Sequence, residues 1–392
     1  MIYDFDQLPD RRATESYKWR HYPPDVLPMW VADMDFVSPE PVVRLLLRRV
    51  AHGVFGYPGG LHGEPDSLPA LRATILLWLE ERFRWQVEPE ALVFMPGVVT
   101  GFNLACHVLE SPREGVLIQT PVYPPILEAA RKTGKIDQQA RLARSAEGRY
   151  SLDGDGLAAR IDAQTGMLLL CNPHNPVGRV FGRLELERLA ELCLRHDLLI
   201  CSDEIHCDLV YPGQEHIPIA WLDAEIARRA ITLMAPSKTF NLAGLKFSYA
   251  IIQNPELRRR YCQASKGLVG WVNLLGQVAA QAAYEEGQEW LSQLLVYLQS
   301  NRDYLTEFVR GELPGVSMVE PEGTYLAWLD CRGAGLEDPY KFFLENARVA
   351  LNDGTTFGEG GQGFVRLNFG CPRSMLAEAL ERMRRALAEG IG

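Results

Sequence analysis

The chain lacks the features that mark secreted and membrane-embedded proteins. No stretch of its 392 residues approaches the roughly 18 consecutive apolar residues that a membrane-spanning helix needs. The first residues, MIYDFDQLPDRR, contain no basic segment followed by an apolar one, which argues against a signal peptide. None of the 8 cysteines forms a C-x-x-C pair, and several lie in apolar runs, as free thiols of a reducing compartment do. These absences predict a soluble, cytoplasmic protein with no membrane partner.

Basic residues are too few for a protein that binds polymeric nucleic acid. The chain has 40 Lys and Arg against 50 Asp and Glu, a formal net charge of −10. A negative surface repels phosphate backbones and anionic lipids, so neither is an expected partner. The arginine clusters at 258–260 and 382–385 lie on amphipathic helical patterns and are expected to be solvated faces.

What the chain does have, from about residue 66, is a rhythm of short apolar runs alternating with helical patterns. The runs are aliphatic or β-branched without polar alternation, which is typical of buried strands in a largely parallel sheet. Helices are then expected on both faces of that sheet. The runs are 92–95, 116–119, 167–171, 198–202, 231–235 and 247–252.

After about residue 286 the pattern changes and indicates a second lobe. We expect a long helix at 289–310, a strand at 324–330, a helix at 338–347 and a strand at 363–369, followed by a terminal helix. The predicted fold class is therefore α/β, a mostly parallel sheet sandwiched by helices plus a smaller α+β domain. The predicted boundaries are an N-terminal arm packing with the small domain (1–45), a large domain (46–285) and a small C-terminal domain (286–392).

Two polar segments directly follow predicted strands, and ligands bind at the carboxyl ends of such strands. Asp203 follows one run and Lys238 follows the next, 35 residues later. Burial lowers the pKa of a lysine and makes it a nucleophile for Schiff bases. Pyridoxal 5'-phosphate (PLP) requires a lysine for its aldehyde and a carboxylate that keeps its pyridine nitrogen protonated. The turn 96–101 opens a helix after another strand, where backbone N–H groups can hold a phosphate.

Two other motifs are less convincing. The segment 358–363 satisfies G-x-G-x-x-G, but it precedes a predicted strand where a dinucleotide site must follow one. We therefore expect a plain loop there. The spacing of Cys201, His206 and Cys207 could suggest zinc, yet no second ligand pair at zinc spacing follows, so we expect no metal.

Four motifs along the chain resemble those of fold-type-I PLP enzymes, the aminotransferase superfamily. They are NPHNPVG at 172–178, SDEIH at 202–206, SKTFN at 237–241 and RLNFGCPR at 366–373. Two N-terminal segments are similar to the MalY/PatB group of cystathionine β-lyases (C–S lyases): MWVADMDF at 29–36 and FGYP at 55–58. The resemblance covers essentially the whole chain.

The resemblance implies a role for each matching residue. Lys238 would hold PLP and move the substrate Cα proton, and Asp203 would pair with the pyridine nitrogen. Tyr123 would stack on the PLP ring, and Asn175 would hydrogen-bond the phenolic oxygen of PLP; both would also contact the substrate. As alternatives, Tyr123 could be a core residue and Asn175 a turn residue. Arg366 would clamp the substrate carboxylate, since a buried arginine requires an anion.

The remaining roles concern the phosphate and the rim of the site. The resemblance implies that the phosphate is held by Gly97, Val98, Val99, Ser237 and Tyr57. Tyr57 would come from the neighbouring subunit, and the resemblance also implies a catalytic role for it. Lys246 stands where aminotransferases often have a phosphate-binding arginine, but lysine lacks the bidentate fork. His206 stands where many have tyrosine, and Ala32 would contact the substrate.

The implied reaction is α,β-elimination of L-cystathionine or a related S-substituted L-cysteine to a thiol, pyruvate and ammonia. The implied assembly is a homodimer with shared sites that binds a small amino-acid substrate. An aminotransferase that uses the same groups stays open as the nearest alternative. A PLP-binding protein that mainly regulates a partner is a further one.

Overall fold

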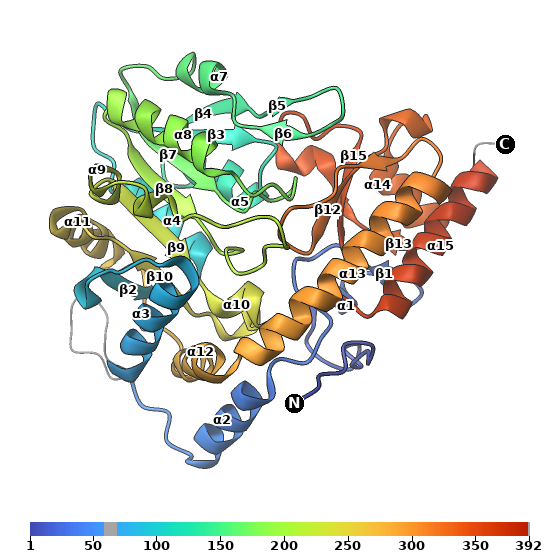
Figure 1. Ribbon diagram of the computed structural model, residues 1–392, viewed down its shortest axis with the longest axis horizontal. Helices are drawn as coiled ribbons and strands as arrows, with labels where there is room; N and C mark the ends of the chain where they lie inside the picture. The colour runs from blue at the N-terminus through green and yellow to red at the C-terminus, as the bar shows by residue number, and fades with distance from the viewer. Residues whose placement is uncertain (59–68, 391–392) are drawn as a thin grey trace.

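The computed structural model describes residues 1–58 and 69–390. A seven-stranded sheet in the order β2-β10-β9-β8-β7-β3-β4 forms the centre of the larger lobe (Figure 1). Neighbouring strands are parallel except for β10, which runs antiparallel to both of its neighbours. The strands are β2 (Leu92–Met95), β3 (Gly115–Thr120), β4 (Ile136–Arg141), β7 (Thr165–Cys171), β8 (Leu199–Asp203), β9 (Ala230–Met234) and β10 (Ser248–Ile251).

Each of the six predicted strands is present, so the predicted α/β class is confirmed. The sequence analysis missed β4 because its residues, IDQQAR, are mostly polar. This strand lies at the edge of the sheet and pairs only with β3, so it has no need of a continuous apolar run.

Both faces of the sheet are buried under helices because successive strand residues point to opposite sides. Val116 and Ile118 of β3 pack in one cluster with residues of α4 (Val98–His107) and α11 (Pro255–Ser265). Leu117, between them, packs in another cluster with residues of α8 (Arg183–Arg195). Two more helices, α3 (Pro69–Phe83) and α12 (Leu274–Glu286), cover the β2–β10 edge.

The smaller lobe is built on an antiparallel sheet in the order β11-β12-β15-β14. Its strands are β11 (Ser317–Met318), β12 (Leu326–Asp330), β14 (Asn352–Asp353) and β15 (Phe364–Asn368). The long helix α13 (Gln288–Glu312) runs between the lobes, and α15 (Arg373–Gly390) closes the chain beside it (Figure 1). The predicted helix at 338–347 is α14 (Pro339–Phe342) followed by a π-helical turn (Phe343–Ala347).

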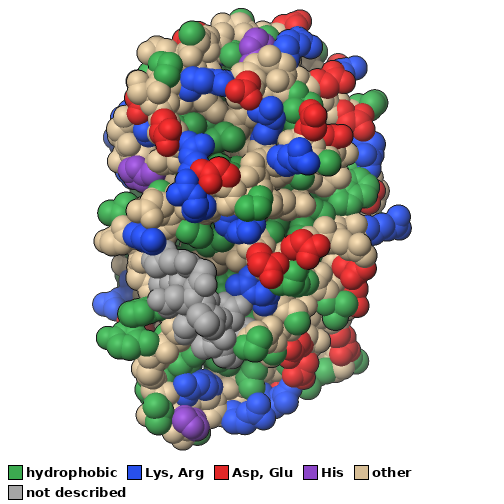
Figure 2. Space-filling view, turned by 90° about the vertical axis from the view of Figure 1, so that its left-hand side faces the viewer, with side chains coloured by type: hydrophobic (Ala, Val, Ile, Leu, Met, Phe, Trp, Pro, Cys, Tyr) green, Lys and Arg blue, Asp and Glu red, His purple; other side chains and the backbone are tan. Residues whose placement is uncertain are grey.

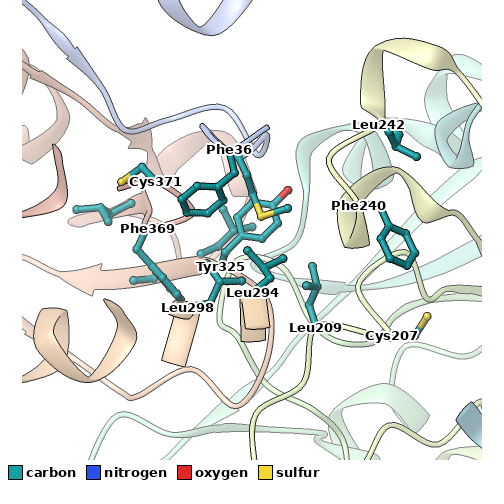
Figure 3. Packing of buried hydrophobic residues seen from close by; sticks show 14 of the residues in the cluster. Phe36, Cys207, Leu209, Phe240, Leu242, Leu294, Leu298, Tyr325, Phe369 and Cys371 are labelled. Carbon is teal, nitrogen blue, oxygen red and sulfur yellow. The ribbon is translucent and has the colours of Figure 1, made fainter. Parts of the chain in front are cut away.

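The N-terminal arm crosses to the smaller lobe, where β1 (Leu27–Pro28) pairs in parallel with β13 (Val349–Ala350). Its last helix, α2 (Glu40–Ala51), lies instead against α12 of the larger lobe. One hydrophobic cluster then joins all three parts: Phe36 from the arm, Phe240 from the larger lobe and Phe369 from the smaller lobe (Figure 3). Because the core continues across positions 45 and 285, the three domain boundaries stay a prediction.

Charged side chains of both signs are interspersed on the face shown in Figure 2, with hydrophobic side chains between them. The arginine clusters have partners within the chain: Arg259 contacts Glu256, and Arg384 and Arg385 contact Glu381. Within residues 1–58 and 69–390, no helix is both long and apolar enough to cross a membrane.

Candidate active site

A cavity of about 210 Å³ opens at the carboxyl ends of the parallel strands. It gathers residues from the ends of β7 and β8, from the turn that follows β9, from the start of α4 and from the N-terminal arm. The predicted site residues that line it are Ala32, Gly97, Val98, Val99, Tyr123, Asn175, Asp203, His206, Ser237, Lys238 and Lys246. Ligands bind at this edge of α/β sheets, so this cavity is the candidate site.

Asp203 and Lys238 come from adjacent strands. Asp203 is the last residue of β8 and lies opposite Leu233 of β9, while Lys238 lies in the single turn α10 (Pro236–Thr239) that follows β9. Burial raises the pKa of Asp203 to about 7, although Lys238 acts in the opposite direction. Burial lowers the pKa of Lys238 to about 8, and Arg366 and Lys246 act in the same direction. About a tenth of the lysine is therefore neutral at pH 7, far more than for a lysine in water.

The turn at the start of α4 is shaped to accept an anion. Gly97 directly precedes the helix with φ 152°, a backbone conformation that favours glycine. Its successors Val98 and Val99 begin the helix, so their backbone N–H groups have no acceptor within it. Ser237 and Lys246 line the same cavity and add a hydroxyl and a cation.

Arg366 lies on β15 of the smaller lobe and reaches across to the larger one. Its Nη1 donates to Asn175 Oδ1 at 2.8 Å, and its Nη2 donates to the Trp30 carbonyl oxygen at 3.1 Å and to Asn352 Oδ1 at 2.5 Å. Its Nε is buried without a hydrogen-bond partner in the described structure. Burial lowers the pKa of Arg366 to about 10. Among the described residues no carboxylate lies within ion-pair distance of this guanidinium, which leaves it available for an anionic ligand.

Tyr123 and His206 line the same cavity as the Asp203–Lys238 pair. The Tyr123 backbone N–H donates to the Asn175 carbonyl oxygen at 3.1 Å, which fixes the two predicted residues relative to each other. His206 is buried against the Tyr325 ring, and its Nδ1 has no partner in the described part of the chain. Burial, together with Lys238 and Arg366, holds the pKa of His206 well below its usual value, so the imidazole is neutral.

Tyr57 lies on the surface of the chain, away from the cavity. Its side chain is 85% exposed and its ring lies 4.6 Å from that of Trp271, measured between centroids. Within one chain it cannot contact a ligand beside Lys238. Its predicted role therefore requires a second subunit and stays a prediction.

The sequence analysis missed several side chains that complete the site. Asn352 lies opposite Arg366 in the β14–β15 pairing, and Phe357 lies under the guanidinium at 5.0 Å. The Tyr325 hydroxyl donates to the Ala32 carbonyl oxygen at 2.9 Å, the same oxygen that accepts from Lys238 at 2.5 Å. No local pattern marks these residues, because only the approach of the smaller lobe brings them to the cavity.

Two further sequence hypotheses can be compared with the structure. The segment 358–363 forms turns ahead of β15, as expected for a loop. In the described part of the chain no group of three or more His, Cys, Asp or Glu side chains could hold a metal ion.

These polar groups fit PLP on three independent counts. The buried Asp203 carboxylate has no cationic nitrogen within ion-pair distance in the described structure, and a protonated pyridine nitrogen would supply one. The α4 N-terminus suits a phosphate, and Lys238, whose pKa burial lowers to about 8, suits an aldehyde. The Arg366 Nε also has no partner in the described structure, and an anion such as a substrate carboxylate would suit it.

Fold and site together define a PLP-dependent enzyme of fold type I. The comparison with family models agrees, since residues 58–383 match the family of class I and II aminotransferases. The chain belongs to this family.

Individual relatives narrow the resemblance. The chain is 39% identical to cystathionine β-lyase PatB of Bacillus subtilis, over 98% of this chain and 100% of that protein. It resembles the crystal structure of OvoB with TM-score 0.93 and 46% identity, covering 99% of this chain and 100% of that one. It also resembles the PLP-bound C–S lyase of Staphylococcus hominis, with TM-score 0.91 and 34% identity over 100% of both chains. The resemblance predicted from the motifs is confirmed.

Proposed function

We propose that this protein is a PLP-dependent carbon–sulfur lyase that cleaves L-cystathionine or a related S-substituted L-cysteine to a thiol, pyruvate and ammonia. The observation that carries the proposal is one cavity lined by Lys238, Asp203 and Asn175. The guanidinium of Arg366, which faces no carboxylate in the described structure, donates a hydrogen bond to Asn175. The choice of cleavage over amino transfer is supported by the relatives named as lyases.

The side chains would divide the work as follows. Arg366 would bind the substrate carboxylate through its Nε and so orient the Cα–H bond. Asn175, which accepts a hydrogen bond from Arg366, lines the cavity. Asp203 would stay ionised beside a cationic ring nitrogen. Lys238 Nζ would accept the Cα proton, which a neutral amine in a desolvated pocket can do near pH 7. When bound, PLP supplies the carbonyl that captures the amine and a ring that stabilises charge at Cα.

The decisive experiment incubates the purified protein loaded with PLP with L-cystathionine, with and without an added 2-oxo acid. A lyase forms pyruvate at the same rate in both cases because elimination needs no amino acceptor. If pyruvate or a new amino acid appears only when the 2-oxo acid is present, the protein is an aminotransferase and the proposal fails. Lys238→Ala should lower the rate at least about 1,000-fold and remove the visible absorption of bound PLP.

We also propose a homodimer with shared sites. Exposed apolar side chains continue from α2 to the segment that carries Tyr57, and they include Leu47, Val50, Val54 and Phe55. Such a surface favours burial against a second copy. Size-exclusion chromatography with light scattering should give twice the 44.0 kDa chain mass. Tyr57→Phe should weaken PLP retention in the dimer, whereas a fully active monomer would contradict a shared site.

The proposed location is the cytoplasm. All eight cysteines are free, and seven of them are buried. Unpaired thiols in this number suit a reducing compartment.

A further inference from the structure

The segment MWVADMDF, at 29–36, forms a wall of the cavity through a single carbonyl group. Ala32 lines the cavity, and its carbonyl oxygen accepts hydrogen bonds from Lys238 Nζ at 2.5 Å and from the Tyr325 hydroxyl at 2.9 Å. A hydrogen bond from an amine to a carbonyl oxygen is stronger when the amine is protonated. The position of this oxygen therefore affects how firmly Lys238 holds a proton.

Two asparagines hold the backbone on both sides of Ala32. Asn368 Nδ2 donates to the carbonyl oxygens of Val31 at 2.6 Å and Asp33 at 2.7 Å. Asn241 Nδ2 donates to the Met34 carbonyl oxygen at 3.0 Å, and its Oδ1 accepts from the Met34 backbone N–H at 3.1 Å. The Ala32 carbonyl group is therefore fixed by the fold and does not depend on a ligand.

Behind this wall lies a cluster of four charged side chains, here called the arm ion cluster: Arg11, Lys18, Asp33 and Asp35. Asp35 is fully buried and accepts from Lys18 Nζ at 2.6 Å and from Arg11 at 2.6 Å. It also accepts from Trp19 Nε1 at 2.7 Å. Asp33 accepts from Arg11 at 2.8 Å and lies 3.8 Å from Lys18 Nζ. Two cations thus face two anions, and every member has a partner.

Asp33 is the member of the cluster that the chain places next to Ala32. Burial lowers the pKa of Lys238 to about 8, and among the charged groups that oppose this effect Asp33 is the strongest, ahead of Asp203. The other charged groups that face Lys238 are Arg366 and Lys246, and both favour the neutral amine. His206 and Tyr325 also face it, the former neutral and the latter with its pKa raised by burial.

We propose that the arm ion cluster controls proton transfer by Lys238, for which the Ala32 carbonyl oxygen is the acceptor of the protonated amine. Asp33, held beside Ala32 by Arg11 and Lys18, is the positioning residue. The proposal rests on Lys238 acting as the base of the proposed function. In the step concerned the substrate Cα–H bond breaks, its electron pair stays on the substrate, and an N–H bond forms at Lys238 Nζ. The negative charge of Asp33 then stabilises the ammonium that results.

The test measures the pKa of Lys238 in the enzyme without PLP, so it does not depend on lyase activity. The pH dependence of Lys238 acetylation by acetic anhydride is followed by mass spectrometry in wild type and in Asp33→Asn. Loss of the Asp33 charge should lower this pKa by about 0.5 to 1 unit, giving roughly three to ten times more neutral amine below the pKa. Asp25→Asn is the matched control, because Asp25 is also an arm carboxylate bound to an arginine, Arg348, but does not act on Lys238.

Further variants separate a charge effect from a structural one. Asp33→Glu keeps the charge and should keep the pKa of Lys238 at its wild-type value. Arg11→Gln leaves the charge of Asp33 less neutralised and should raise the pKa of Lys238.

In the PLP-loaded enzyme, exchange of the L-alanine Cα proton with deuterated water should slow several-fold in Asp33→Asn, because L-alanine has no leaving group and reports proton transfer alone. Asp25→Asn should leave the pKa of Lys238 unchanged. If Asp33→Asn and Arg11→Gln also leave it unchanged, the proposal is wrong even if the protein is a lyase. If instead the pKa shifts while cystathionine is not cleaved, only the lyase assignment fails.

Discussion

Two regions of this molecule bury charged side chains, and they do so in opposite ways. In the arm ion cluster each buried charge meets an opposite charge, as Asp35 does with Lys18 and Arg11. At the strand ends, Asp203 and Arg366 are equally buried, yet in the described structure neither has an oppositely charged partner within ion-pair distance. A buried charge without a partner is unfavourable unless a ligand supplies one. The first region therefore stabilises the fold, and the second is prepared for a cofactor and a substrate.

The largest expected effect is on the stability of the arm ion cluster. Lys18→Met leaves Asp35 with one cation fewer in a dry site and should lower the free energy of unfolding by about 3–5 kcal/mol. Urea unfolding of the protein without PLP measures this loss. Lys132→Met is the control, because Lys132 forms an exposed pair with Glu128 and its loss should cost less than about 1 kcal/mol. Equal losses in both variants would mean that the cluster is not the stabilising element described here.

The second effect should appear in catalysis and hardly in stability. Arg366→Lys keeps a positive charge but loses the Nε–H donor and the planar group that Asn175 and Asn352 orient, so kcat/KM for L-cystathionine should fall about 100-fold. Unfolding without PLP should change by less than half of the loss in Lys18→Met. The comparison between the two regions fails if this variant is as unstable as Lys18→Met.

The smallest effect concerns pH. Burial raises the pKa of Asp203 to about 7, above its value in the unfolded chain, so ionisation disfavours the folded state. Without PLP, the contribution of Asp203 to the free energy of unfolding should therefore be most favourable below about pH 4. This contribution should decrease as the pH rises from about 4 to about 7. In Asp203→Asn this decrease should be absent, which makes the variant more stable than wild type at pH 8, on the order of 2 kcal/mol.

Thermal unfolding at pH 5 and pH 8 checks this prediction. The same variant should retain PLP poorly, because a neutral amide cannot keep the pyridine nitrogen protonated. A variant that shows the wild-type pH dependence would mean that Asp203 is already ionised and compensated without the cofactor.

The parts of the fold that were predicted correctly are those in which local pattern and burial agree. Buried strands such as β7 and β9 must be apolar on both faces, so their runs stand out in the sequence. The edge strand β4 is partly exposed and was missed. The antiparallel direction of β10 was also not predicted, because direction is set by the path of the connecting chain and leaves no pattern in the strand.

The candidate site divides in the same way. Asp203, Lys238 and Gly97 were found because each directly follows a strand, where the fold itself creates a ligand site. Asn352, Phe357 and Tyr325 were not found, since each belongs to the smaller lobe and reaches the cavity only when the lobes meet. Tyr57 was named from the resemblance, and its position outside the cavity of its own chain became visible only in the folded structure.

By itself the sequence determined the alternation of strands and helices, the family, and the Asp203–Lys238 pair that lines the cavity. Each of these depends on residues close together in the chain or at fixed positions relative to a strand. Only the tertiary structure decided which charges are compensated. Asp33 and Asp35 look alike in MWVADMDF, yet Asp35 is fully buried among Lys18, Arg11 and Trp19, while Asp33 lies beside the carbonyl group that contacts Lys238. The electrostatic energy of a buried charge depends on distances across the fold, and these distances are not encoded in any local motif.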